Sequence, residues 1–222
     1  VPVIDQEGQL LGIVTVDEIV DVIREEATED FLQMAGAGKD REILMKSSWD
    51  NARSRLPWLF ASWVGGVCAA AIIGIFDNTL QSTLALAAFI PVVIGMGGNI
   101  GTQTSTLVVR GLATGRVNVG NNINIIFKEI RVGLILGILY GLLLGLFAIM
   151  SFVNISPYLG LVVGLGIACS MLIATAFGSL VPLLLHRMDI DPAIATGPFV
   201  TTSIDILGVT LYFVIAKIFL PV

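Results

Sequence analysis

The chain has 222 residues, of which 55% are hydrophobic and 13% are charged, and its formal net charge is −5. Soluble domains usually carry about a quarter of their residues as charged ones, so this composition predicts an integral membrane protein with a polar segment attached. The acidic balance, concentrated in residues 1–55, excludes the basic face that nucleic-acid binding requires.

Residues 1–16 have the pattern of two short strands joined by a turn. VPVI is followed by the turn-forming QEGQ, and LLGIVTV is typical of a buried strand. So small a sheet cannot bury a core of its own, and we expect it to be the end of an α/β domain. The segment resembles the C-terminal half of a CBS module. Such modules often bind adenosine nucleotides through a Thr and a carboxylate three residues later, places that Thr15 and Glu18 occupy here. The resemblance implies nucleotide binding only in a complete module.

Residues 17–55 are predicted to form an acidic plug helix and a linker. The helical pattern is DEIVDVIREEATEDFLQM, which Asp17 is suited to cap. Glu26, Glu29 and Asp30 stand at positions i, i+3 and i+4, so they share one face, called the acidic face below. Like charges at this spacing destabilise a helix. Two interpretations stay open: a solvated surface, or a face that divalent cations such as Mg²⁺ neutralise, because carboxylate oxygens suit hard cations.

Five apolar segments predict five membrane-spanning helices, since crossing the hydrocarbon core takes about 20 apolar residues. Leu80–Val109 has no charge and exceeds one straight crossing, so we expect Pro91 and the glycine-rich Gly95–Asn99 to break or kink the second span, with the break at the glycine-rich motif. Asn154–Pro157 separates the third span from the fourth. The sequence therefore predicts an all-α integral membrane protein with a pore domain over residues 56–222 and spans at about 56–76, 80–109, 132–152, 158–185 and 193–218.

The distribution of basic residues predicts the orientation of these spans. The loops after the second and fourth spans carry most of the basic residues of the membrane half, and the positive-inside rule places such loops in the cytoplasm. An odd number of spans leaves the termini on opposite sides. We therefore expect a multi-pass protein of the cell membrane with its N-terminus in the cytoplasm and its C-terminus outside. The loop residues concerned are Arg110, Arg116, Lys128, Arg131 and Arg187.

Small residues recur at helical spacing in two of the spans. Such ridges let helix backbones approach closely in lipid. Packing within one chain is the simpler interpretation, and a face between two copies of the chain is the alternative. The ridges consist of Gly133, Gly137, Gly141 and Gly145 in the third span and of Gly66, Ala70 and Gly74 in the first.

Gly95–Gly115, with the sequence GMGGNIGTQTSTLVVRGLATG, is the most distinctive stretch of the chain. Its glycines suit backbone that bends or approaches another group closely. Irregular backbone at membrane depth persists only inside protein or beside a water-filled cavity. The neutral side-chain oxygens that follow fit either the lining of a path for a hydrated cation or polar contacts between helices. The predicted pore-lining residues are Gly97, Gly98, Asn99, Thr102, Gln103 and, from the fifth span, Thr201.

Asp205 is the one charged residue between Pro192 and Ala216. Asp191 can cap a helix that has Pro192 as its first residue. Asp205 comes fourteen residues later, and a rise of 1.5 Å per residue puts it about 20 Å deeper, near the middle of the membrane. Ionisable residues inside spans face a bundle interior or an aqueous path. The fifth span therefore offers a candidate cation site at Asp205 and a second candidate ligand, Asp191, at the mouth.

Together these motifs resemble the MgtE family of magnesium channels. The resemblance implies a homodimer with a pore on its two-fold axis, in which Mg²⁺ is both the transported ion and the gating ligand. It also implies a soluble sensor with two CBS modules before the pore, most of which has no counterpart here, and a plug helix that closes the pore at high cytosolic Mg²⁺. The matching segments, in order, are EEATED, Gly97-Gly98-Asn99-x-Gly101-x-Gln103, Arg110-Gly111-Leu112-Ala113-Thr114, Asp191-Pro192 and Asp205.

The function predicted on this basis is a Mg²⁺-selective channel, not an enzyme, that moves magnesium into the cytoplasm. Two-fold symmetry would bring a second copy of Asp205 to the same axis. Mg²⁺ gives up its water reluctantly, so we expect these carboxylates to contact the hydrated ion. Asp191 and the acidic face are the other expected metal ligands.

Three other functions fit parts of the sequence. A secondary transporter would use Asp205 as a proton or Na⁺ site, but such proteins usually show inverted repeats and paired broken helices. An intramembrane aspartyl protease needs two membrane carboxylates that share a proton, and only Asp205 lies deep in a span. A membrane anchor for a CBS sensor would leave the glycine-rich stretch and Asp205 unexplained.

Overall fold

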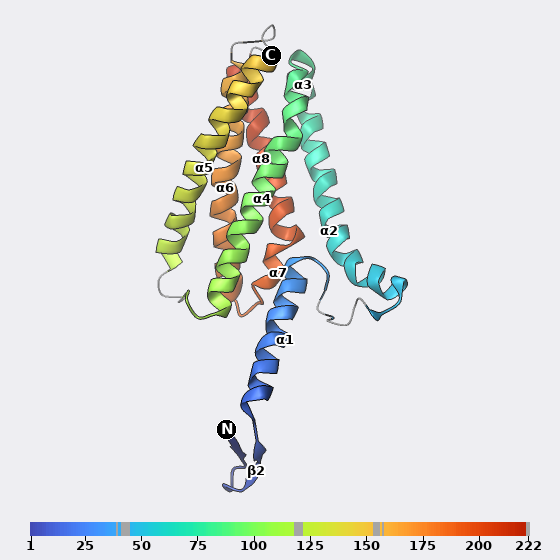
Figure 1. Ribbon diagram of the computed structural model, residues 1–222. Helices are drawn as coiled ribbons and strands as arrows, with labels where there is room; N and C mark the ends of the chain where they lie inside the picture. Colours follow the sequence, from blue (N-terminus) through green and yellow to red (C-terminus); the bar gives the residue numbers. More distant parts are fainter. Residues whose placement is uncertain (39, 41–44, 118–121, 153–155, 157, 221–222) are drawn as a thin grey trace.

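The computed structural model describes residues 1–38, 40, 45–117, 122–152, 156 and 158–220. Within them, five helices are long and apolar enough to cross a membrane, as the sequence predicts. Four of these helices stand side by side, and α2 slants away from them (Figure 1). The chain is thus a multi-pass, membrane-embedded, all-α protein with a small strand pair at its N-terminus. The five helices are α2 (Ser48–Ile75), α4 (Ala85–Ala113), α5 (Asn122–Ser151), α6 (Leu159–Arg187) and α8 (Pro198–Phe219).

The N-terminal segment projects from one end of the bundle (Figure 1). It consists of an antiparallel pair, β1 (Pro2–Ile4) and β2 (Leu10–Ile13), followed by α1 (Val16–Met34). The predicted cap at Asp17 is wrong, because Thr15 caps α1. The Thr15 hydroxyl accepts the backbone N–H of Glu18, and the Glu18 carboxylate accepts the backbone N–H of Thr15. This capping box satisfies two backbone donors at once.

The second span is not broken at the glycine-rich stretch, and that prediction is wrong. A short helix, α3 (Asp77–Ser82), ends first, and α4 then runs without interruption through Pro91 and Gly95–Asn99. Two of the α4 glycines, Gly97 and Gly101, allow close packing, because neighbouring helices occupy the space that their side chains would need. A Cβ on Gly97 would lie 2.6 Å from Ser170 Oγ, and one on Gly178 of α6 would lie 2.6 Å from the Gly101 carbonyl oxygen.

The fifth span, in contrast, is interrupted where the sequence analysis expects a continuous helix. The short α7 (Ala193–Thr196) ends at Gly197, whose φ and ψ are −80° and −141°, and α8 begins at Pro198. Proline disfavours helical geometry in the residue before it, and glycine accepts the conformation that results. Because Asp205 is the eighth residue of α8, it lies about 10 Å along this helix. It is therefore closer to the α7 end of α8 than to the Phe219 end, but it lies beside Gly98, which is near the midpoint of α4.

Helix α6 is the centre of the bundle, with α5, α4 and α8 packed around it. The glycine ridge of α5 packs within the chain: a Cβ on Gly141 or Gly145 would lie 2.7 Å from a carbonyl oxygen of α6. The buried Tyr212 donates a hydrogen bond to the Leu86 carbonyl oxygen at 3.1 Å, which joins α8 to the start of α4. Other large buried side chains of the same core are Phe89, Phe213, Leu86, Leu159, Ile167, Met171 and Ile204.

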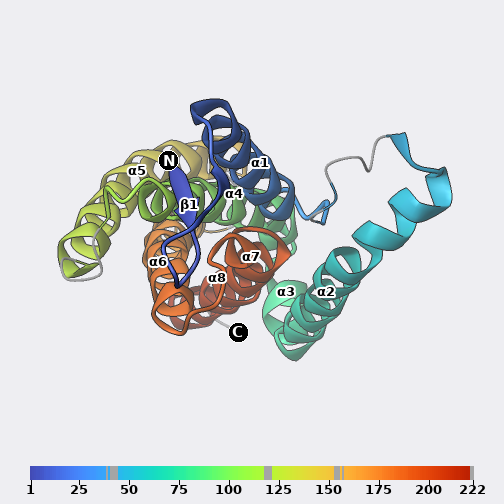
Figure 2. The ribbon, with the colours of Figure 1, turned by 90° about the horizontal axis from the view of Figure 1, so that it is seen from below.

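Helix α2 packs against α8 and is otherwise largely exposed, as the view along the bundle shows (Figure 2). Gly65 and Ala69 are the buried residues of α2, and a Cβ on Gly65 would overlap the Thr202 side chain of α8. The predicted ridge of α2 is not the packing face. Gly66 and Gly74 have open space where a Cβ would be. Of the two interpretations offered for this ridge, packing within the chain is therefore wrong.

The described ends of the chain lie at opposite ends of the bundle, as an odd number of spans requires (Figure 1). The turn after α4 and the start of α5 lie at the same end as α1. The predicted separator Asn154–Pro157 falls largely outside the described residues, and α5 ends at Ser151 while α6 begins at Leu159.

Candidate functional site

Asp205 stands beside a glycine of the distinctive α4 segment. The residue is half-buried, and a Cβ on Gly98 would lie 3.6 Å from Asp205 Oδ1. A side chain at this position would therefore start in van der Waals contact with the carboxylate. The structure thus brings together two predicted site residues that are 107 positions apart in the sequence. Glycine at position 98 thus leaves this side of the carboxylate without a neighbouring side chain from that position.

Ser170 of α6 fixes how closely α4 and α8 approach each other around Asp205. Its hydroxyl donates to the Val93 carbonyl oxygen at 3.3 Å. A Cβ on Gly208 of α8 would lie 2.7 Å from Ser170 Oγ, nearly as close as one on Gly97. Gly97 is buried at this junction, so within one chain it serves packing and does not line an open path. Ser170 is missed by the sequence analysis, because a serine in a long apolar span carries no signal of its own.

The other predicted pore-lining residues flank Asp205 on the outside of the bundle. Asn99 and Gln103 lie one helical turn apart on α4, and both side chains are exposed. Thr102 is half-buried and donates its hydroxyl to the Gly98 carbonyl oxygen at 2.9 Å. Thr201 of α8 donates to the Pro198 carbonyl oxygen at 3.2 Å. Each threonine oxygen keeps an acceptor lone pair, so this polar row can accept hydrogen bonds from water.

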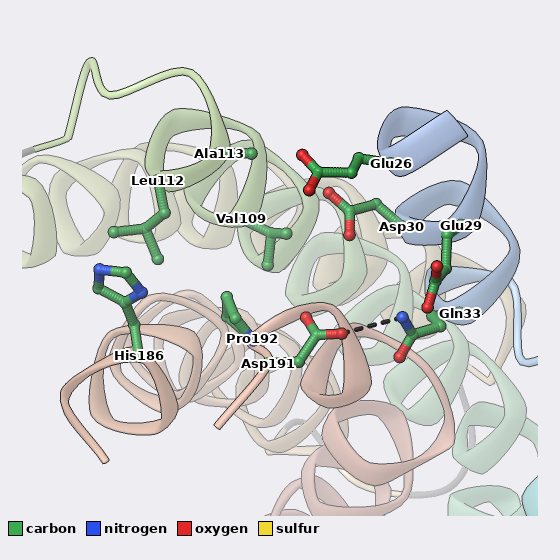
Figure 3. Close-up of a pocket in the computed structure, with 10 residues that line it drawn as sticks. All are labelled: Glu26, Glu29, Asp30, Gln33, Val109, Leu112, Ala113, His186, Asp191 and Pro192. Carbon is green, nitrogen blue, oxygen red and sulfur yellow. Dashed lines mark hydrogen bonds between the residues drawn. The ribbon is translucent and has the colours of Figure 1, made fainter. Parts of the chain in front are cut away.

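A separate cavity of about 510 Å³ opens where α1 meets the bundle, and we call it the mouth. The acidic face of α1 forms one wall, the end of α4 another, and the segment from α6 to α7 the rest (Figure 3). Predicted metal ligands from opposite parts of the chain therefore share one cavity, to which Asp205 does not contribute. The mouth is lined by Glu26, Glu29, Asp30, Gln33, Val109, Leu112, Ala113, His186, Asp191 and Pro192.

Hydrogen bonds to both carboxylate oxygens hold Asp191 at the mouth. Its Oδ1 accepts the backbone N–H of Ala193 at 2.9 Å, and its Oδ2 accepts the side-chain N–H of Gln33 at 2.9 Å. The predicted start of a long span at Asp191-Pro192 is wrong, since only the four-residue α7 follows directly. The bond to Ala193 nevertheless resembles a cap in its effect, because it satisfies a donor at the helix start.

The acids of the mouth are not packed as a tight metal site. Among the described residues, no three carboxylate, histidine or cysteine side chains are close enough to hold a bare ion together. A cavity of this size instead leaves room for an ion with its water. Mg²⁺ usually keeps several of its waters and is held by only one or two carboxylates. The spacing therefore suits contact through water better than direct coordination.

Two residues of the mouth, Gln33 and His186, are missed by the sequence analysis. Gln33 lies three residues after Asp30 and four after Glu29, so its place on the acidic face could be read from the spacing. His186 is the only histidine in the chain and follows the long uncharged stretch of the fourth span. Thr15 and Glu18, the candidate nucleotide contacts, bond each other in the capping box.

Comparisons with known proteins identify the family of the chain. A family model described as MgtE, divalent cation transporter, matches residues 90–215, which include Asp205 and the α4 segment. Proteins named magnesium transporter MgtE from Bacillus subtilis, Enterococcus faecalis and Thermus thermophilus are 39%, 38% and 36% identical to it over 99% of this chain. The match covers 48% of each relative, so the chain spans about half the length of the curated relatives it matches. The chain belongs to the MgtE family of divalent cation transporters.

Proposed function

We propose that the chain is the pore-forming part of a Mg²⁺ channel of the cell membrane that works as a homodimer, with the pore on the two-fold axis. One observation carries the proposal: the polar side chains of α4 that follow Gly98, the neighbour of Asp205, include two that are exposed on the outside of the bundle. Asn99 and Gln103 are exposed at a level where the surroundings of a single chain are hydrocarbon. An amide without partners there costs several kcal/mol. A second copy of the chain against this face would enclose an aqueous path between the polar side chains of the two α4 helices.

The chemistry of this path suits hydrated Mg²⁺. Amide, hydroxyl and carbonyl oxygens accept hydrogen bonds from the waters of the ion, while the two Asp205 carboxylates supply negative charge on the axis. Ions must bind firmly enough to enter and weakly enough to leave. Contact through water meets this condition better than direct coordination, because Mg²⁺ loses its waters reluctantly.

The acidic face supports a role in gating by cytosolic Mg²⁺. Its three carboxylates and Asp191 line the mouth together, and their mutual repulsion weakens when cations occupy the space between them. Mg²⁺ would therefore favour the arrangement in which α1 lies against the mouth. With the N-terminal side cytoplasmic, as the basic loops indicate, rising internal Mg²⁺ would act to limit further entry.

A second candidate is an ion-coupled transporter with Asp205 as a proton or Na⁺ site. The observation in its favour is the interruption between α7 and α8, since discontinuous helices are common at the binding sites of such transporters. The two candidates differ in their energy source. Flux through a channel follows the Mg²⁺ gradient and the membrane potential alone, whereas a coupled transporter responds to the gradient of the second ion.

The test is Mg²⁺ uptake into liposomes that contain the purified chain and an internal Mg²⁺ indicator. Asp205→Ala and Asp205→Asn should both abolish uptake while chromatography still shows a dimer. Asp189→Asn is the matched control, because Asp189 lies between the spans with a φ of 55°, a conformation that asparagine accepts well. Wild-type uptake by Asp205→Ala would refute a pore site at this carboxylate. Uptake that stops when the proton or Na⁺ gradient is removed would favour the transporter.

A further inference from the structure

Gln33 occupies an unusual position for an amide at the edge of a membrane protein. It is in the last turn of α1, its side chain is only 1% exposed, and it is the buried residue of that helix. Its Nε2 donates to Asp191 Oδ2 across 158 positions of sequence. Its Oε1 is buried and has no hydrogen-bond partner among the described residues. Buried amide oxygens are usually satisfied, so this atom requires an explanation.

The orientation of this amide follows from the carboxylate opposite. A reversed amide would set Oε1 against Asp191 Oδ2, two acceptors in contact, so the donor end must face Asp191. Both Asp191 oxygens then accept a hydrogen bond, Oδ2 from Gln33 and Oδ1 from Ala193. A carboxylate fixed at both oxygens cannot rotate freely. Gln33 and Ala193 thus determine where the remaining lone pairs of Asp191 point.

We propose that Gln33 is a positioning residue of the mouth, which orients Asp191 so that this carboxylate and the acidic face act on the same hydrated divalent cation. The inference rests on the proposed function for the identity of the ion, and on the shared cavity for its location. Oε1 itself is covered by protein in this arrangement, so a water of the ion would donate to it only after the Gln33 side chain shifts. The same bond makes the site depend on α1, since Asp191 loses Gln33 whenever α1 leaves the mouth.

The first test measures binding without transport. Mn²⁺ replaces Mg²⁺, and its free fraction is followed by electron paramagnetic resonance in an Asp205→Asn background that removes the charge of the other site. Gln33→Met keeps the length of the side chain but cannot donate, and we expect about tenfold weaker Mn²⁺ binding, the effect of losing a hydrogen bond to a charged group. The matched control is Gln81→Met. Gln81 also donates to a carboxylate, Asp77 Oδ2 at 2.7 Å, but at the opposite end of the bundle.

Gln33→Lys tests whether Gln33 acts by orienting Asp191 or only by holding α1 against the bundle. Lysine also donates to Asp191, and its charge should hold α1 in place. It would at the same time neutralise the carboxylate, so Mn²⁺ binding should be weaker than in Gln33→Met. Wild-type Mn²⁺ affinity in Gln33→Lys would show that attachment alone suffices and would overturn the proposal. So would equal affinities in Gln33→Met and Gln81→Met.

Flux measurements then distinguish a failure of the proposed role of Gln33 from a failure of the proposed function. With Asp205 intact, Gln33→Met should raise the Mg²⁺ concentration for half-maximal inhibition from the cytoplasmic side and leave the maximal rate unchanged. A protein that merely folds less well would lose maximal rate instead. If no variant and no wild-type protein passes Mg²⁺, the proposed function fails, while the Mn²⁺ comparison still decides the role of Gln33.

Discussion

Gly65→Ala is a sensitive perturbation of the fold, because Gly65 is buried where α2 packs against the helix that bears Asp205. A Cβ at this position would overlap the Cγ2 of Thr202 and lie 2.9 Å from its Cβ. Threonine is branched at Cβ and has few rotamers to escape into. The two helices must therefore separate slightly, or Thr202 must adopt a strained side-chain conformation.

The magnitude follows from comparison with Gly66→Ala, one residue along the same helix. Both variants gain about 1 kcal/mol of helix propensity, but a Cβ on Gly66 meets nothing within 4 Å. The difference between them isolates the steric cost, which for an overpacked interior is about 1–3 kcal/mol. At about 2–4 °C per kcal/mol for a chain of this size, Gly65→Ala should unfold several degrees below Gly66→Ala.

The assay is thermal unfolding in detergent, followed by the amount of protein that still elutes as a folded species. Thr202→Ser removes the overlapping methyl group, so the double variant Gly65→Ala with Thr202→Ser should recover most of the lost stability. Equal melting temperatures for Gly65→Ala and Gly66→Ala would refute the proposed contact. A loss that Thr202→Ser fails to recover would place its cause elsewhere in α2.

Three further predictions concern the mouth and the orientation. Triple alanine substitution of the acidic face, in a chain that carries a complete sensor, should weaken inhibition of uptake by cytosolic Mg²⁺; an unchanged inhibition curve would reduce these acids to a solvated surface. Asp191→Asn should fold normally, because asparagine also accepts the Ala193 N–H, and should lower Mn²⁺ occupancy at the mouth; equal anomalous scattering would leave Asp191 only its structural bond. In intact cells that express a variant without Cys68 and Cys169, a cysteine at Lys217 should react with an impermeant reagent from outside, and one at Arg116 should not. The reverse labelling pattern would show the opposite orientation.

Hydropathy predicts the spans well, and local spacing predicts their interruptions poorly. A run of 20 apolar residues has few alternatives to a membrane helix, so all five spans are identified within a few residues at most ends. Gly95–Asn99 is misread as a break because glycine also serves close packing, and only the positions of Ser170 and Ile204 decide between the two. The true interruption carries a signal, the Gly197-Pro198 pair, since such dipeptides mark turns.

Contacts between distant parts of the chain explain the remaining differences between the sequence-based predictions and the structure. The shared face of the α1 acids follows from helical spacing. Its position opposite Asp191 depends on how α1 packs against the bundle, which helical spacing does not determine. Gly65 and Gly66 differ by about 100° around the helix, so a ridge of small residues in sequence does not reveal which side meets a neighbour. Gln33 is a similar case, because its partner lies 158 positions away.

The end of α1, the interruption of the fifth span and the start of α8 meet at one place, which connects the mouth mechanically to Asp205. A Cβ on Gly197 would lie 3.6 Å from the carbonyl oxygens of Gln33 and Met34, and one on Gly36, where φ is 67°, would lie 3.5 Å from Pro198. The last turn of α1 therefore rests directly on the break between α7 and α8. From Pro198, two turns of uninterrupted helix lead to Asp205. A displacement of α1 at the mouth would thus act directly on Pro198, the first residue of the helix that carries the proposed pore carboxylate. No other element has to transmit the movement.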